Sequence, residues 1–246
     1  MSVLEVVALV LAGAASGWIN VLAGGGSFLT MALLMGMGLD ANQANGTIRP
    51  GILAQNLLAV FLLRSTGLIR ASEVWRWSPA VVLGAVLGSQ LASSCPPEAF
   101  RRWMIPLVLV GCYPLLQDLR GHKQQQAVVR AGRAPDLYFF LAGMYGGLIQ
   151  AGVGFWLLGA ARHAGFDLRR GNALKVALTL MLGLPSMVVF ARAGQIDLSA
   201  SLWLGLGTLA GSYVGADWLA FKSLRWIKAA LLLGLLVFVL HLAMTG

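Results

Sequence analysis

Two cations, Arg49 and Lys175, lie well inside apolar segments, and they are the only two of the eighteen lysines and arginines to do so. A charged side chain is costly in hydrocarbon, so an ionisable residue within a membrane segment is by default a candidate functional site. Arg can hold an oxyanion through two N–H groups, and Lys offers a compact charge with three donors. The nine Asp and Glu residues lie at the chain end, in loops or at segment ends. The two cations therefore predict a site for an anion that arrives as substrate.

Polar residues accompany each cation on the same predicted helix. They are Asn45, Thr47, Gln55 and Asn56 beside Arg49, and Asn172 and Thr179 beside Lys175. The alternative is that each cation snorkels, because each lies within about three helical turns of a membrane surface. From this pattern we assign five residues to substrate binding: Asn45, Thr47, Arg49, Asn172 and Lys175.

Glycines interrupt two long apolar stretches, within the sequences AGGGSF (23–28) and AGVGF (151–155). Each glycine costs a helix about 1 kcal/mol relative to alanine, so we expect broken or re-entrant helices at Gly24–Gly26 and at Gly152–Gly154. A short helix that restarts after a break offers free N–H groups and a positive dipole end to an anion. The alternative is close helix packing through small residues. The binding residues assigned here are Asn20, Gly24, Gly25, Gly26, Ser27, Gln150, Gly152 and Gly154.

The composition is that of an integral membrane protein. Of the residues, 58% are hydrophobic and 11% charged, and the mean hydropathy is +0.78. Apolar stretches long enough to cross a bilayer recur along the chain and leave no soluble domain. The net charge of +9 is spread over short loops rather than gathered on one face, which argues against nucleic-acid binding.

The chain contains a tandem repeat. Gly38, Asp40 and Asn45 recur as Gly165, Asp167 and Asn172 at an offset of 127 residues, and Arg102-Trp103 recurs as Arg225-Trp226 at an offset of 123. We expect one transmembrane domain, 1–246, made of repeat 1 (1–117), a cytoplasmic linker (118–136) and repeat 2 (137–246).

Each repeat divides into five apolar segments, of which the second is short. The ten segments are 3–22, 27–38, 42–63, 78–94, 103–117, 137–150, 153–163, 171–191, 199–217 and 226–244.

The distribution of loop cations favours an odd number of segments in each repeat. If all segments cross, one side collects thirteen cations and the other collects three, Arg101, Arg102 and Arg192. The thirteen are Arg64, Arg70, Arg76, Arg120, Lys123, Arg130, Arg133, Arg162, Arg169, Arg170, Lys222, Arg225 and Lys228. A single broken crossing at the start of each repeat would divide the same loops evenly. Since cytoplasmic loops are enriched in Lys and Arg, we expect an all-α polytopic membrane protein with an inverted repeat and both termini in the periplasm.

Four motifs carry a family resemblance. They are GxxNxxAGGGSF (17–28), ANGTxR (44–49), GGxxQAGVGF (146–155) and GNALK (171–175). With these motifs in this order over nearly its full length, the sequence resembles the sulfite exporter TauE/SafE family. The resemblance implies transport of sulfur-containing anions, such as sulfite, sulfoacetate and other organosulfonates, across a bacterial inner membrane.

We therefore expect a secondary transporter that exports a small sulfur oxyanion or organosulfonate by alternating access. One alternative is a passive anion channel. Another is an intramembrane lipid-modifying enzyme, although His122, His163 and His241 all lie in loops or near a terminus, far from both breaks. The expected partners are a small anionic substrate and membrane lipids, and homodimer formation is left open. No catalytic residue, metal or cofactor is expected.

Overall fold

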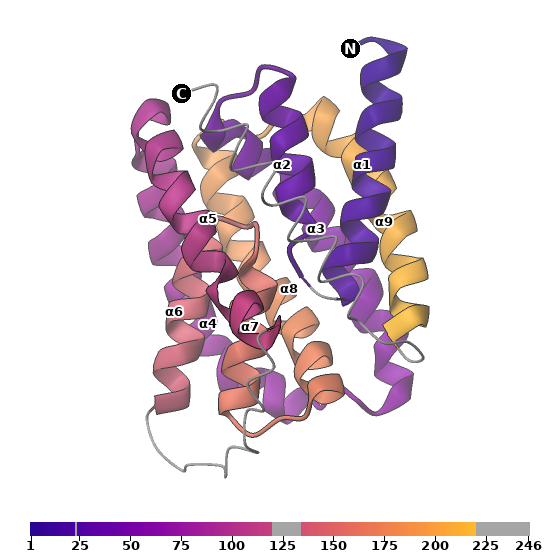
Figure 1. Cartoon of the computed structure of the whole chain (residues 1–246), viewed down its shortest axis with the longest axis vertical. Helices are drawn as coiled ribbons and strands as arrows, with labels where there is room; N and C mark the ends of the chain where they lie inside the picture. The colour runs from indigo at the N-terminus through magenta and orange to yellow at the C-terminus, as the bar shows by residue number, and fades with distance from the viewer. Residues whose placement is uncertain (23, 120–133, 220–246) are drawn as a thin grey trace.

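The computed structural model describes residues 1–22, 24–119 and 134–219, and every regular element in these ranges is a helix (Figure 1). The elements are α1 (Val3–Leu22), α2 (Ser27–Gly36), α3 (Ala41–Leu63), the 3₁₀ turn η1 (Arg64–Thr66), α4 (Ala71–Ser94), α5 (Pro97–Leu119), α6 (Ala134–Leu148), α7 (Val153–His163), α8 (Leu168–Arg192) and α9 (Leu198–Leu219). The expected all-α class is confirmed for this part of the chain.

Nine of the ten expected segments coincide with a helix, and the tenth, 226–244, lies outside the described residues. The helices extend beyond the apolar segments where their first turns are polar. α4 begins at Ala71 rather than at 78, and its early turns carry Glu73 and Arg76. Hydropathy finds only the part of a helix that faces hydrocarbon, so it misses such polar turns. For the same reason α5 and α6 extend into the predicted linker, 118–136. Residues 120–133 of this linker lie outside the described part of the chain.

The starts of α3 and α8 have the same local structure. Asp40 caps α3 by accepting from the backbone N–H of Gln43 at 2.8 Å. Asp167 caps α8 by accepting from the N–H groups of Arg169 and Arg170 at 2.9 and 3.0 Å. An aspartate in this position satisfies N–H groups that have no partner within the helix. The repeated Gly-Leu/Phe-Asp sequence therefore encodes one helix start twice.

Contacts between helix termini define two ends of the helical bundle. At the first, the Met1 end, the backbone N–H of Asp197 donates to Thr47 Oγ1, and Asn42 donates to the carbonyl of Cys95. At the second, the Arg70 end, ion pairs join Arg76 to Asp136 and Arg170 to Glu73, and the ring of Tyr138 lies against that of His163. In Figure 1 the Met1 end is at the top and the Arg70 end at the bottom.

Two helix pairs each begin and finish at one end of the bundle. α1 starts at the Met1 end, and α2 returns there to join the start of α3. α6 starts at the Arg70 end, and α7 returns there to join the start of α8. The glycine breaks are the turning points, where Gly24, Gly25 and Gly152 have positive φ angles of 76°, 115° and 81°.

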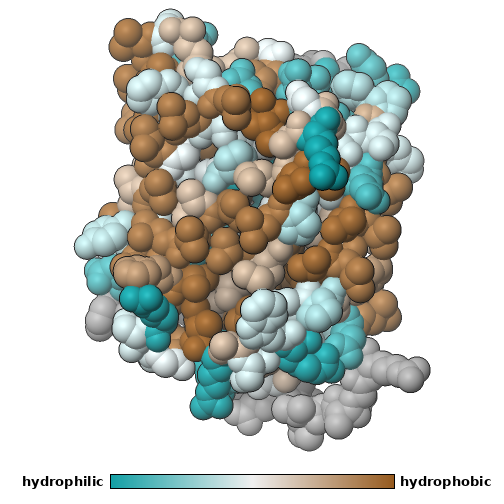
Figure 2. Space-filling view, turned by 180° about the vertical axis from the view of Figure 1, so that it is seen from behind, coloured by the Kyte–Doolittle hydropathy of each residue, from teal (hydrophilic) through white to brown (hydrophobic). Residues whose placement is uncertain are grey.

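On the face shown in Figure 2, apolar side chains fill a broad middle zone, and polar side chains gather at the lower end and at the upper right. Leu57, Leu83 and Leu202 are among the large hydrophobic side chains that the described residues expose. Among the described residues, three helical stretches are long and apolar enough to cross a membrane: Val3–Leu22, Ala41–Thr66 and Leu168–Arg192. These features agree with a protein that lies within a bilayer.

Glycines at i, i+4 spacing mark the closest helix contacts. Gly207 and Gly211 on α9 approach the backbone of Val10 and Ala14 on α1, and Gly84 on α4 approaches that of Phe140 on α6. Small residues let membrane helices approach until their backbones touch. The α1–α9 and α6–α4 contacts therefore hold the first arm of each broken pair against a helix of the other repeat.

We expect Gly211→Ala to destabilise the folded protein, because the added Cβ would lie 2.7 Å from the carbonyl carbon of Ala14 and 2.9 Å from the backbone nitrogen of Trp18. Overpacking of this kind costs about 1–3 kcal/mol. The matched control is Gly159→Ala on α7, where a Cβ would meet nothing within 4 Å and alanine should be neutral or stabilising. Melting temperatures of both variants in detergent test the prediction, which is wrong if they shift equally.

Candidate functional site

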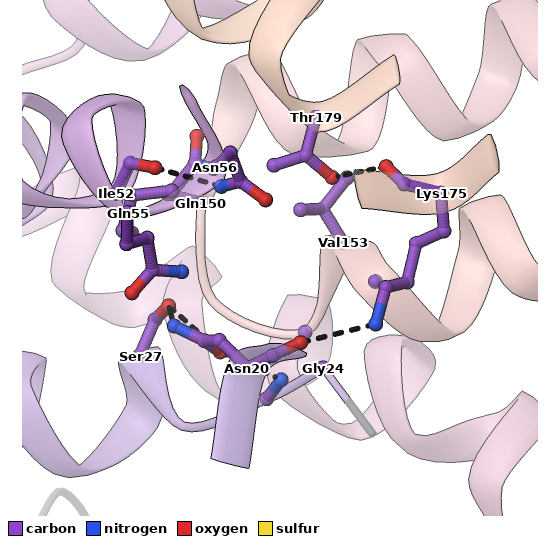
Figure 3. Close-up of a pocket in the computed structure, with 13 residues that line it drawn as sticks. Asn20, Gly24, Ser27, Ile52, Gln55, Asn56, Gln150, Val153, Lys175 and Thr179 are labelled. Carbon is purple, nitrogen blue, oxygen red and sulfur yellow. Dashed lines mark hydrogen bonds between the residues drawn. The ribbon is translucent and has the colours of Figure 1, made fainter. Parts of the chain in front are cut away.

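A small pocket lies where the two glycine breaks meet α3 and α8 (Figure 3). The space within it, with open solvent at the mouth included, is about 290 Å³. The lining residues are Asn20, Gly24, Gly25, Ser27, Ile52, Gln55, Asn56, Gln150, Gly152, Val153, Gly154, Lys175 and Thr179. None is a carboxylate, and Lys175 is the one charged group among them. The pocket therefore suits a small anion.

Lys175 reaches the pocket from α8 and points its ammonium at the end of α1. Its Nζ donates to the carbonyl oxygens of Asn20 at 3.0 Å and Val21 at 3.2 Å. The side chain is buried, so it does not snorkel to a membrane surface. Because an ammonium group has three donors and two are used here, one remains for a ligand.

Asn172 lies one turn before Lys175 and completes the cap on α1. Its Nδ2 donates to the carbonyl oxygens of Val21 at 3.1 Å and Leu22 at 3.3 Å. The last carbonyls of a helix have no partners within the helix and carry partial negative charge. Asn172 and Lys175 together satisfy these groups, which allows α1 to end inside the protein.

Arg49 has the corresponding role at the end of α6 and lies outside the pocket lining. Its guanidinium donates to the carbonyl oxygens of Gly146 and Gly147 at 3.3 and 2.8 Å, and to Gln150 Oε1 at 3.0 Å. It also lies 4.2 Å from the ring centroid of Phe190. Only 1% of the residue is exposed, so Arg49, like Lys175, does not snorkel.

Asn45, one turn before Arg49, completes the cap on α6. Its Nδ2 donates to the carbonyl of Leu148 at 2.8 Å, and its Oδ1 accepts from the backbone N–H of Gln150 at 3.1 Å. Thus α3 caps the end of α6, and α8 caps the end of α1. Arg49 is four residues after Asn45 and Lys175 is three after Asn172, and both spacings place the cation and the amide on one helix face. This explains how cations that are one residue out of register perform the same structural task.

The two breaks touch each other at glycine. A Cβ on Gly24 would lie 2.8 Å from the Cα of Gly154, and a Cβ on Gly154 would lie 2.8 Å from the Cα of Gly24. Gly154 belongs to the first turn of α7 rather than to the break, where the sequence had placed it. It is glycine because the opposite backbone occupies the space of a side chain.

The starts of α2 and α7 both contribute to the pocket, through Ser27 on α2 and Val153 and Gly154 on α7. No side chain caps either helix start. The N-terminus of a helix carries about half a positive charge. The positive ends of α2 and α7 therefore meet the ammonium of Lys175 at a pocket that no carboxylate lines, an arrangement that favours an anion.

The structure brings eight of the thirteen assigned binding residues into the pocket: Asn20, Gly24, Gly25, Ser27, Gln150, Gly152, Gly154 and Lys175. The other five lie around it. Asn45, Arg49 and Asn172 cap α6 and α1, Thr47 accepts from the N–H of Asp197, and a Cβ on Gly26 would meet the backbone of Ser16.

Five lining residues were not assigned from the sequence: Ile52, Gln55, Asn56, Val153 and Thr179. Three of these are polar residues already noticed beside the cations. Their spacing could have identified them, because Ile52, Gln55 and Asn56 lie at i, i+3 and i+4, and Lys175 and Thr179 at i and i+4, so each set shares a helix face.

Comparison with known proteins agrees with this architecture. The family profile described as sulfite exporter TauE/SafE matches residues 9–242. The chain belongs to this family. The TauE/SafE match spans both breaks and both buried cations. The motifs at 17–28, 44–49, 146–155 and 171–175 supply nine of the thirteen lining residues and the side chains that cap α1 and α6.

Relatives within the TauE/SafE family are named as membrane transporters. A probable membrane transporter protein, ORF9, of Sinorhizobium sp is 26% identical over 89% of this chain and 84% of its own length. A second, from Haemophilus influenzae, is 26% identical over 83% and 80%, and YfcA of Escherichia coli K12 is 22% identical over 87% and 80%. No solved structure matches the chain. The chain is thus a membrane protein of a transporter family rather than an enzyme.

Proposed function

We propose that the protein is a secondary transporter that exports a small sulfur oxyanion or organosulfonate, such as sulfite or sulfoacetate, by alternating access. The observation that carries this proposal is the pocket between the two glycine breaks, which contains a buried ammonium and two uncapped helix starts but no carboxylate. Half-helices that meet near the bilayer midplane bind anions through their N-termini in several transporter folds.

Within this proposal, Lys175 contacts the anion directly and Arg49 holds the break that forms the opposite wall. Lys175 lines the pocket with one donor unused. Arg49 lies outside the lining, and its two terminal nitrogens donate to α6, Asn45 and Gln150, while its buried Nε has no partner among the described residues. No ion pair joins either cation to another described residue. The substrate then supplies the negative charge that pairs with the ammonium of Lys175.

The proposed topology is an inverted repeat, with α1–α2 and α6–α7 as re-entrant pairs from opposite faces of the membrane. Equivalent glycines support it: Gly38 and Gly165 have φ angles of 96° and 89°, and Gly67 and Gly194 have 70° and 69°. Among the described loop cations, six lie at the Arg70 end and three at the Met1 end. The positive-inside rule then places the Arg70 end in the cytoplasm of a bacterial cell and the N-terminus in the periplasm.

The proposed direction follows from the membrane potential. A potential that is negative inside favours anion efflux by about 2.3 kcal/mol per charge per 100 mV, so export needs no coupling ion. Uptake would need a coupling ion such as a proton. None of the residues that line the pocket is a carboxylate that could relay protons.

Counterflow in proteoliposomes tests the proposal. Vesicles loaded with unlabelled sulfite are expected to accumulate labelled sulfite transiently, with an initial rate that saturates, because a carrier exchanges bound ligands across the membrane. Protein-free vesicles provide the background. A flux that never saturates, together with single-channel currents, would indicate a passive channel, and the absence of any protein-dependent anion flux would refute both.

A further inference from the structure

Asn56 presents a fixed hydrogen-bond acceptor to the pocket. Its Nδ2 donates to the carbonyl of Ile52 at 2.7 Å. A carbonyl oxygen accepts but cannot donate, so this contact fixes the orientation of the Asn56 amide. Its Oδ1 is then the atom that faces the pocket (Figure 3). A substrate made only of acceptor oxygens would place oxygen against oxygen here.

Gln55, the neighbouring residue, is a buried amide without a partner. Its Oε1 accepts no hydrogen bond from any described residue, although only 1% of the residue is exposed. Buried polar groups are nearly always paired, and an unpaired one in a native structure needs an explanation. Figure 3 shows the Nε2 of Gln55 toward the pocket and its Oε1 turned away, so Gln55 offers a donor that suits the charged oxygens of an anion and leaves Asn56 as the fixed acceptor.

The pocket is therefore polarised. The ammonium of Lys175 lies on the α8 side, and the amides of Gln55 and Asn56 lie opposite on α3 (Figure 3). Resting on the proposed function, we propose that the preferred substrate is a monoanion that carries its own hydrogen-bond donor, such as a hydroxyl group. The charged oxygens face Lys175, and the donor binds Asn56 Oδ1.

Charge balance supports a monoanion. Lys175 is the one titratable group among the residues that line the pocket, and its charge matches one negative charge. The amide oxygens would also suit a metal cation, but such a cation would share the pocket with the ammonium of Lys175. A donor carried on an anion satisfies both sides of the pocket at once.

Two sulfonates of equal charge provide the test. 2-Hydroxyethanesulfonate and ethanesulfonate differ by one hydroxyl group. We expect the hydroxylated anion to bind the purified full-length protein at least tenfold more tightly, as measured by isothermal titration and by competition with labelled sulfite. A site built to bind a hydroxyl group discriminates strongly against the analogue that lacks it. In Asn56→Leu, which keeps a similar volume without the acceptor, the preference should fall below about threefold.

Sulfite provides a second measurement that does not depend on the size of the ligand. The affinity for total sulfite should rise as the pH falls through its second ionisation, because the protonated monoanion replaces the dianion, and Asn56→Leu should lose this dependence. Equal binding of the two sulfonates, an unchanged preference in the variant, or sulfite affinity that is flat or falls with protonation overturns the proposal. If neither sulfite nor either sulfonate binds, the proposed function itself is wrong.

Discussion

Lys175→Gln is expected to weaken anion binding about 100-fold, the equivalent of about 2.7 kcal/mol. Glutamine can still donate to the carbonyl of Asn20, so the variant removes the charge and keeps part of the cap on α1. The expected loss in affinity is large because Lys175 is the one charged group that lines this buried pocket. In the variant, little water is present to stabilise the anion in place of the ammonium. Binding of sulfite to the purified variant, with counterflow in proteoliposomes, measures the effect.

Two matched variants separate the charge from other effects of Lys175→Gln. Lys175→Arg keeps the charge and should retain binding within about tenfold of the wild type. Arg70→Gln removes one charge from an exposed position at the Arg70 end and should leave binding unchanged. If Lys175→Gln binds sulfite as tightly as the wild type while the melting temperature is unchanged, the pocket is not the anion site.

The chemistry of the site could be predicted from residue type, but its spatial arrangement could not. Two buried cations in an apolar chain, and glycines at two breaks, identify where a membrane protein departs from simple helices. The sequence does not show which helix end each cation would meet. Arg49 contacts carbonyls about a hundred residues away, at Gly146 and Gly147, and no local pattern encodes a contact between repeats.

Helix faces account for the residues that were missed. Glycine and charge are conspicuous in an apolar segment, whereas Ile52 and Val153 are ordinary apolar residues whose place in the pocket depends on how α3 and α7 are rotated. Asp40 and Asp167 stood out in the sequence only as members of the repeat, and both cap a helix, because a cap depends on neighbours in sequence. Local signals thus predicted elements, and tertiary packing decided which side chains meet.

Arg49→Gln is expected to destabilise the protein by about 3 kcal/mol or more, and thus to have a larger effect on folding than on the pocket. The variant leaves the carbonyls of Gly146 and Gly147 and the Oε1 of Gln150 without the donors that they have now. Glutamine is too short and has too few donors to replace a guanidinium that donates to four groups. The melting temperature of the purified variant in detergent, and its yield from the membrane, measure the loss.

The two glutamine variants are expected to differ in whether they change anion binding or protein stability. Lys175→Gln should reduce binding far more than stability, and Arg49→Gln should reduce stability far more than the binding of the fraction that folds. Arg70→Gln is again the control, since it removes an equal charge and the side chain of Arg70 makes no capping hydrogen bond to a helix end. If Arg49→Gln melts at the wild-type temperature yet fails to bind sulfite, Arg49 contacts the anion directly. The sequence-based assignment would then be right, and the division of roles inferred from the structure would be wrong.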